Sequence, residues 1–197
     1  MIHKIHKDTM VIGIDNNNNK VNRKISDLEP GFKIVGYDLN NDCECLNTVL
    51  EIIPLSAPKE NQMRLWFNTE TNGDTFVVID KDQELDYFNL ATNNWEYKKA
   101  DDFECTDIAK SFKDQIKVGH HDYNCDMNED EFVALRLDNS HNFYARRHEM
   151  SEEQQKEEMK KQRSKDVTDQ ASENNLIKEP VVYDKLYTDC ILIRSEK

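Results

Sequence analysis

Short apolar runs separated by polar turn residues dominate the chain up to about residue 147. Residues 9–15 form a β-branched run, and the asparagines after it supply a turn. Similar runs predict strands at residues 20–25, 32–38, 45–53, 64–68, 75–80, 86–90, 96–98, 131–137 and 142–144. A single helical turn is expected at residues 26–31, which end in Pro-Gly. No helix-period pattern separates the strands, which argues against a parallel βαβ fold. The pattern predicts one compact all-β domain over residues 1–147.

The pattern of the chain changes at about residue 148. Ser151, followed three residues later by Gln154, matches a capping box and predicts a charged α-helix that ends near residue 166. This helix can bury little of its surface, because Met159 and Val167 are the only apolar residues between Ser151 and Gln170.

Two apolar stretches follow the predicted helix, at residues 176–183 and 187–194. Apolar side chains at the end of a polar segment favour docking over free solvation. We therefore expect residues 148–197 to form a charged helix and an extended C-terminal arm, which docks on its own domain or on a partner.

Composition narrows the classes of function. The net charge of −13 gives the protein a field that repels phosphate backbones, so binding to nucleic acid is not expected. No apolar run approaches the roughly 18 residues that span a bilayer, and the start of the chain lacks the apolar region of a signal peptide. The five cysteines are odd in number and scattered, which favours reduced thiols. We expect an intracellular, cytoplasmic protein that binds no membrane.

Three stretches, in order along the chain, carry a resemblance to a known family. Residues 8–38 contain a segment similar to I-x-D-L-x-x-G-D-x-V. Residues 72–103 are similar to G-x-x-L-x-x-T-x-x-H-x-x-L followed by W-x-x-A-x-x-L, and residues 132–145 to V-x-x-L-x-V-x-x-x-H-N-F-x-A. These are segments of the Hint family, which comprises hedgehog autoprocessing domains and inteins. The resemblance covers residues 4 to about 147 and implies a Hint-like β domain.

The resemblance also assigns positions to the self-cleavage chemistry of that family. The family nucleophile, a Cys or Ser, falls on Lys4, and only three residues precede it. The family threonine and histidine fall on Ile79, which has no polar atom, and on Asp82, which is normally ionised. The residues directly after Ala145 contain no His-Asn pair of the kind that ends an intein. The resemblance therefore implies a degenerate member of the family that is not an enzyme and needs no cofactor.

The leading hypothesis is a non-enzymatic structural or interaction subunit of a larger protein assembly. Its partners would be other protein subunits that contact the C-terminal helix and arm. The side chains expected to make these contacts are Arg146, Arg147, Met159, Val181, Tyr183, Tyr187, Ile191 and Ile193. Residual autoprocessing, through some other residue, stays open as an alternative.

A small metal-binding module is the second alternative. Cys43 and Cys45, with His120, His121 and Cys125, supply enough soft ligands for zinc. Cys-x-Cys differs from the usual Cys-x-x-Cys knuckle, however, and we expect surface positions with no metal.

Other residues favour structural roles over chemistry. The acidic run at residues 122–131 lacks the glycine and the terminal glutamate of a calcium-binding EF-hand loop, so we interpret it as a solvated loop. The ring of His141 is expected to bridge the turn between two strands. Five aromatic residues are expected in the core: Trp66, Phe67, Phe76, Trp95 and Phe132.

Overall fold

The structure is a computed structural model that describes residues 3–69, 73–112, 115–123, 125, 127–147 and 190–196. These residues belong to one compact unit, made of residues 1–147 and 182–197. The charged helix expected at residues 148–166 lies outside the described residues.

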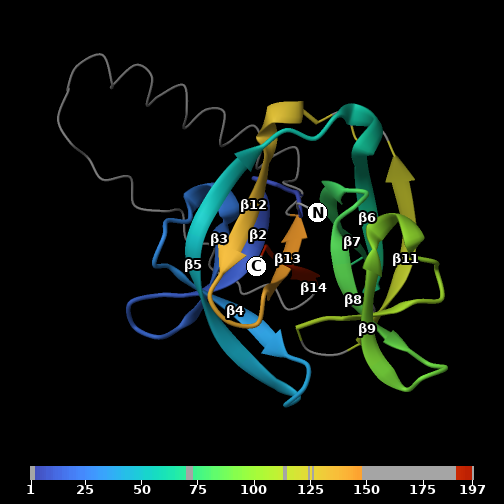
Figure 1. Ribbon diagram of the computed structural model, residues 1–197, viewed down its shortest axis with the longest axis horizontal. Coiled ribbons are helices and arrows are strands. Elements are labelled where there is room, and N and C mark those ends of the chain that lie inside the picture. The colour runs from blue at the N-terminus through green and yellow to red at the C-terminus, as the bar shows by residue number, and fades with distance from the viewer. Residues whose placement is uncertain are drawn as a thin grey trace. The chain divides into compact units, whose positions relative to one another are not determined.

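Fourteen strands and four single-turn 3-10 helices make up the described part of the chain (Figure 1). The strands are β1 (Ile5–His6), β2 (Thr9–Ile14), β3 (Lys20–Lys24), β4 (Lys33–Asp38), β5 (Cys43–Leu55), β6 (Gln62–Thr69), β7 (Gly73–Asp80), β8 (Glu84–Asn89), β9 (Asn94–Lys99), β10 (Ile108–Lys110), β11 (Gln115–Tyr123), β12 (Phe132–Leu137), β13 (Asn142–Arg147) and β14 (Ile191–Arg194). The 3-10 turns are η1 (Ile25–Asp27), η2 (Lys59–Asn61), η3 (Ala100–Asp102) and η4 (Glu129–Glu131). The prediction of an all-β domain is confirmed.

The strands form one continuous hydrogen-bonded system. Its order is β10-β11-β6-β7-β1-β12-β5-β4-β2-β13-β14-β8-β9, with β3 paired to β2 and a further pairing between β10 and β8. The long strand β5 joins two parts of this system, since Cys43–Thr48 pairs with β4 and Val49–Leu55 pairs with β12. In Figure 1 it curves along one side of the domain. The β10–β8 pairing closes the path into a ring.

The same small unit occurs twice in this ring. A hairpin followed by a 3-10 turn is built once from β2, β3 and η1 and again from β8, β9 and η3. In the first copy Leu28 N donates to Ile25 O at 3.1 Å, and in the second Phe103 N donates to Ala100 O at 3.2 Å. All four side chains are buried, so each turn is held by its apolar anchors. The segments that lead into the two hairpins are the ones that meet at the candidate site.

The C-terminal strand β14 is part of this domain. It pairs with β13 over Ala145–Asn142 and contacts β8 through Ile193 and Leu85. Ile191 and Ile193 belong to the largest core cluster and are 0% exposed. The apolar end of the arm therefore docks on its own domain, and the separate C-terminal region expected from residue 148 does not extend to these residues.

Candidate functional site

Three segments that are far apart in the sequence meet where β1 begins. They are the residues before β1, the turn between β7 and β8, and the end of β14. Asp80 N donates to Lys4 O at 3.0 Å, and Ile5 lies opposite Ile79 in the β1–β7 pairing. Lys4, Ile79 and Asp82, which the Hint resemblance places at catalytic positions, are thus brought together at one end of the paired strands.

Asp80 organises the polar side of this junction. Its Oδ2 lies 3.3 Å from the Nζ of Lys4, and its Oδ1 accepts the backbone N–H of Asp82 at 3.0 Å. The Asp80 side chain is only 3% exposed, against 21% for Lys4. A carboxylate buried to this extent needs its partners, because an unpaired charge in the interior is costly.

The other two positions that the resemblance marks as catalytic have different environments. Ile79 is completely buried among apolar side chains. Asp82 is about half exposed and accepts a hydrogen bond from Lys99 Nζ at 2.7 Å. This hydrogen bond holds the pKa of Asp82 below its ordinary value. The Asp82 carboxyl group is therefore ionised at neutral pH and has no proton to give.

The end of β14 completes the junction, which the sequence did not predict. Gln83 Nε2 donates to Arg194 O at 2.8 Å, and Ser195 N donates to His141 O at 2.8 Å. His3 N donates to a carboxylate oxygen of Glu196. The signal was present in the apolar run at residues 190–193, which is followed by polar residues, but only the fold shows that this run returns to the start of β1.

His3 lies inside the same junction. Its Nδ1 accepts the backbone N–H of Glu84 at 3.3 Å and lies 3.2 Å from Gln83 Nε2. Burial lowers the pKa of His3 from its ordinary value, against the opposing effect of the Glu196 and Glu84 carboxylates. The neutral imidazole, which accepts at Nδ1, fits this environment.

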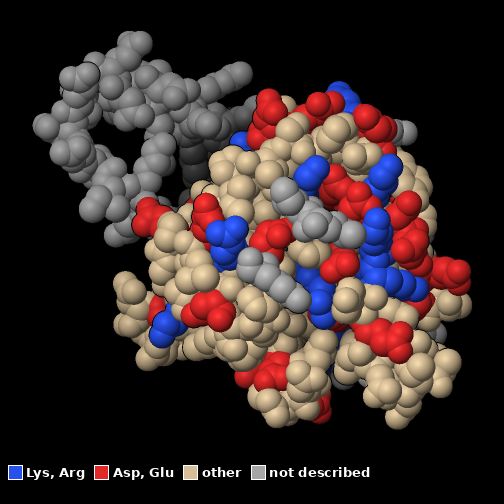
Figure 2. All heavy atoms as spheres, viewed as in Figure 1, with Lys and Arg blue, Asp and Glu red and all other residues tan. Residues whose placement is uncertain are grey.

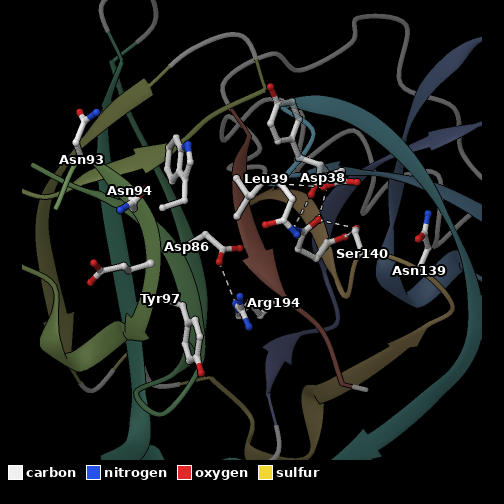
Figure 3. A pocket seen from close by; sticks show the side chains of 14 residues that line it. Asp38, Leu39, Asp86, Asn93, Asn94, Tyr97, Asn139, Ser140 and Arg194 are labelled. Carbon is white, nitrogen blue, oxygen red and sulfur yellow. Dashed lines mark hydrogen bonds and ion pairs between the residues drawn. The ribbon is translucent and has the colours of Figure 1, made fainter.

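A cleft of about 920 Å³ opens beside the end of β14 (Figure 3). The loop after β4, the β8–β9 hairpin and the β12–β13 turn form its walls. Its lining residues are Tyr37, Asp38, Leu39, Asn40, Asp86, Asn93, Asn94, Trp95, Glu96, Tyr97, Asn139, Ser140, Asn142 and Arg194. Trp95 is therefore a half-buried cleft residue, and its expected place in the core is corrected: it stacks edge-on with Phe88 at the hairpin.

One ion pair lies in the middle of this cleft. Arg194 Nε donates to Asp86 Oδ1 at 3.0 Å, and the guanidinium of Arg194 lies 3.9 Å from the ring centroid of Tyr97. Figure 3 shows Asp86 and Arg194 between the Asn93–Tyr97 hairpin on one side and Asp38, Leu39 and Ser140 on the other. Burial raises the pKa of Asp86, which the neighbouring Arg194 opposes.

An amide network supports the wall of the cleft formed by β4. The Oδ1 of Asn142 accepts from Tyr37 N, and its Nδ2 donates to Tyr37 O, each at 2.9 Å, so this side chain pairs with β4 as a neighbouring strand would. Buried Asn47 donates to Asn142 O at 2.8 Å and accepts from Ser140 N at 2.8 Å. Gly36 is required here, because an added Cβ would lie 2.6 Å from Asn142 O.

The residues expected to contact a partner are scattered. Arg146 and Arg147 lie on β13, opposite Met10 and Thr9 of β2. Ile191 and Ile193 are core residues, so the expectation that they contact a partner is corrected: neither side chain reaches the surface. The other four, Met159, Val181, Tyr183 and Tyr187, lie outside the described residues.

The described residues do not assemble a metal site. No group of three or more His, Cys, Asp or Glu side chains in the described ranges is arranged to hold a metal ion. Cys43 and Cys45 lie on β5 beside β4, whereas Cys125 is buried with Phe76 and Phe132. His121 lies on β11 opposite Leu65, and the side chain of His120 is not among those described.

Described residues of the acidic run at 122–131 make local structural contacts. Asp122 accepts from the indole N–H of Trp66 at 2.8 Å, and Asn128 caps the η4 turn by accepting from Asp130 N. His141 has a positive φ of 55° in the β12–β13 turn, and its carbonyl anchors Ser195. The ring Nδ1 of His141, however, has no hydrogen-bond partner among the described residues, so the backbone carbonyl and not the ring makes this contact.

Acidic and basic side chains are interleaved over the face seen in Figure 2. Several acidic and basic side chains of the domain are paired, including Lys99 with Asp82 and Arg136 with Glu51. Among the described residues no helix is long and apolar enough to cross a membrane.

Comparisons with known proteins identify the fold. No model of a protein family matches the sequence, and no curated protein matches it either.

Solved structures of inteins do match. A bacterial intein-like domain from Clostridium thermocellum superimposes with a TM-score of 0.55 at 13% identity, over 74% of this chain and 94% of that one. A DnaB intein from Synechocystis sp. PCC 6803 gives 0.52 at 13% identity, over 75% and 99%. The transcription factor IIB Mvu mini-intein gives 0.52 at 13% identity, over 73% and 95%. The chain therefore has the Hint fold, as the sequence resemblance predicted.

Proposed function

We propose that this chain is a Hint-fold domain without self-cleavage activity, which serves as a non-enzymatic binding subunit of a larger protein assembly. The observation that carries the first half of the proposal is the Lys4–Asp80 ion pair. Where the family resemblance expects a nucleophile, a buried carboxylate instead holds an ammonium group at 3.3 Å.

The chemistry of the junction supports the loss of activity. An ammonium group has no lone pair for attack on a carbonyl carbon. Ile79 has no polar atom to polarise an amide, and the ionised Asp82 has no proton for a leaving nitrogen.

The C-terminal side of the junction lacks the matching residues as well. An intein would finish in Val-His-Asn, but residues 146–152, which follow Ala145 here, contain no His-Asn pair. Release of a C-terminal segment through a succinimide starts from the side-chain amide of that asparagine, so these residues offer no starting group for it.

The second half of the proposal is a role in binding other proteins. We assign the contacts with a protein partner to Arg146 and Arg147 of β13 and to the apolar residues between positions 159 and 187. The sequence between β13 and β14 combines many charged residues with scattered apolar ones, a composition suited to contacts with a partner.

Native co-purification tests this role. The full chain, tagged and expressed in its own cells, is cross-linked and its partners are identified by mass spectrometry. Y183A/Y187A should lose the partner, while Y123A, an exposed tyrosine on β11, should retain it. If the full chain is monomeric and its 148–189 segment stays protease-sensitive in cell extract, the binding role is wrong.

A further inference from the structure

We propose that the cleft beside β14 binds an acidic segment of a protein partner, with Arg194 as the group that holds its carboxylate. This inference rests on the proposed binding role and names the site and the chemistry of the bound segment. It is argued from the guanidinium of Arg194, the carboxylates around it and the walls of the cleft.

Contacts with Asp86 and Tyr97 hold the guanidinium of Arg194 in place, but only one of its nitrogens is hydrogen-bonded within the part of the chain that the structure describes. Its Nε is bound to Asp86, and its plane lies against Tyr97. Among the described residues nothing hydrogen-bonds to its two terminal nitrogens, and the side chain is 27% exposed in a wide cleft. The edge formed by two terminal nitrogens matches the two oxygens of a carboxylate, which it binds in a bidentate manner. Since the fork is already fixed, little side-chain entropy is lost on binding.

Asp86 positions this fork without closing it. The carboxylate is 1% exposed, so it lies behind the guanidinium and away from solvent. Only its Oδ1 bonds to Arg194, and no hydrogen-bond partner of its Oδ2 is found in the described residues. The site thus offers a fixed donor fork toward the cleft.

Two further carboxylates line the cleft, and both accept hydrogen bonds from residues near them in the sequence. Asp38 accepts from the backbone of Asn40 and from Asn41, and Glu96 accepts from Thr92, Asn89 and Tyr87. Neither pairs with Arg194. Their fixed negative charge, on a chain of net charge −13, opposes a multiply charged phosphate ligand more strongly than a single carboxylate, whose binding must come from the Arg194 fork and the walls.

The walls fit a peptide segment. Tyr37, Leu39, Trp95 and Tyr97 supply apolar surface, and the amides of Asn93 and Asn94 supply donors and acceptors like those of a peptide backbone. A volume of about 920 Å³ lies at the upper end of the range for ligand sites, which is enough for several residues of extended chain. We therefore assign the cleft to an Asp or Glu side chain, with flanking apolar residues, from a partner protein.

A displayed library of random dodecapeptides provides the probe. It is selected on the immobilised full chain, and the binders are resynthesised with blocked ends. Enriched peptides should share an acidic residue, and its replacement by Asn or Gln should weaken binding at least tenfold. R194K keeps the charge but loses the fork, and Y97A removes the stacked ring, so each should weaken binding at least fivefold. R136K, a paired surface arginine outside the cleft, should bind like the wild type.

Thermal melts of the variants separate loss of binding from loss of folding, since the Tyr97 side chain is more than half exposed and R194K retains the charge facing Asp86. No enriched peptide, enrichment without an acidic residue, or binding unaffected by R194K and Y97A would each overturn the inference. If acetate binds at this site but no peptide does, the peptide assignment is also wrong. If a partner co-purifies through Tyr183 and Tyr187 but the library yields no binder, the proposed binding role stands and only the assignment of the cleft is wrong.

Discussion

The Nζ of Lys4 lies 3.3 Å from Oδ2 of Asp80, across the junction of the first strand and the β7–β8 turn. The two residues are 76 positions apart in the sequence, so the pair exists only because β1 docks beside β7. At the position where self-cleaving members of the fold are expected to hold a nucleophile, this chain has an ion pair. An ion pair here fastens the start of the chain to the domain.

Lys4→Met should destabilise the domain by about 1–3 kcal/mol, because it leaves the Asp80 carboxylate buried without its cation. Urea unfolding followed by tryptophan fluorescence measures the change. Lys7→Met is the matched control: Lys7 pairs with Glu131, but both side chains are more than 30% exposed, so the cost should stay below about 1 kcal/mol. Equal effects of the two substitutions would show that Asp80 does not depend on Lys4.

Ile193→Ala should cost about 2–4 kcal/mol, since it empties a fully buried position of β14 in the main core. Leu50→Ala, on the half-exposed surface of β5, should cost under about 1 kcal/mol. Chemical denaturation of both variants distinguishes a docked C-terminal strand from an arm that leaves the domain. A cost for Ile193→Ala as small as for Leu50→Ala would refute the docking of β14.

Asn142→Ala should destabilise the domain by about 2–4 kcal/mol, because it removes both hydrogen bonds to the backbone of Tyr37 and the Oδ1 that accepts from Ser140 Oγ. Asn40→Ala, at the rim of the same cleft, removes no side-chain hydrogen bond of the described network and should be nearly neutral. Thermal unfolding of the pair measures the difference. A neutral Asn142→Ala would mean that β4 holds its position through strand pairing alone.

His3 should make stability depend on pH. Its pKa is lowered in the folded state, so between that pKa and 6.5 the unfolded chain binds more protons than the folded one. This contribution to stability is complete above about pH 6.5 and falls as the pH drops through the lowered folded value. His3→Gln should make the unfolding free energy fall less between pH 7.5 and pH 5.5 than it does in the wild type. An unchanged difference would place the imidazole in a solvated environment.

Much of the fold could be read from the sequence. β-branched runs and turn residues predicted most of the strands of residues 1–147, and the turn around Ile25 was expected one residue late. The strands that were not predicted are β1, β10, β11 and β14. They are short, as β1 is, or rich in charged and histidine residues, as β11 is, and they gain their pairing from tertiary neighbours rather than from local propensity.

The site was less accessible to sequence reasoning. The resemblance placed Lys4, Ile79 and Asp82 at corresponding positions, and the fold brings them together. The roles of Arg194 and Asp86 were missed, because 108 residues separate them and neither stands in a recognisable motif. Trp95 and Ile193 were assigned opposite environments from those they have. Residue type alone does not show whether an apolar side chain near a chain end, such as Ile193, or an aromatic side chain in a strand, such as Trp95, faces the core or the surface.

The central claim, that self-cleavage is absent, is tested most directly by the intact mass of a fusion. A test domain is joined directly before Lys4 of the full chain, and the protein is incubated with and without hydroxylamine or a thiol. The account predicts one mass, that of the uncleaved fusion, under every condition and equally for the Lys4→Ala variant. Release of the test domain that depends on hydroxylamine or thiol would contradict it, whether or not the release persists in Lys4→Ala.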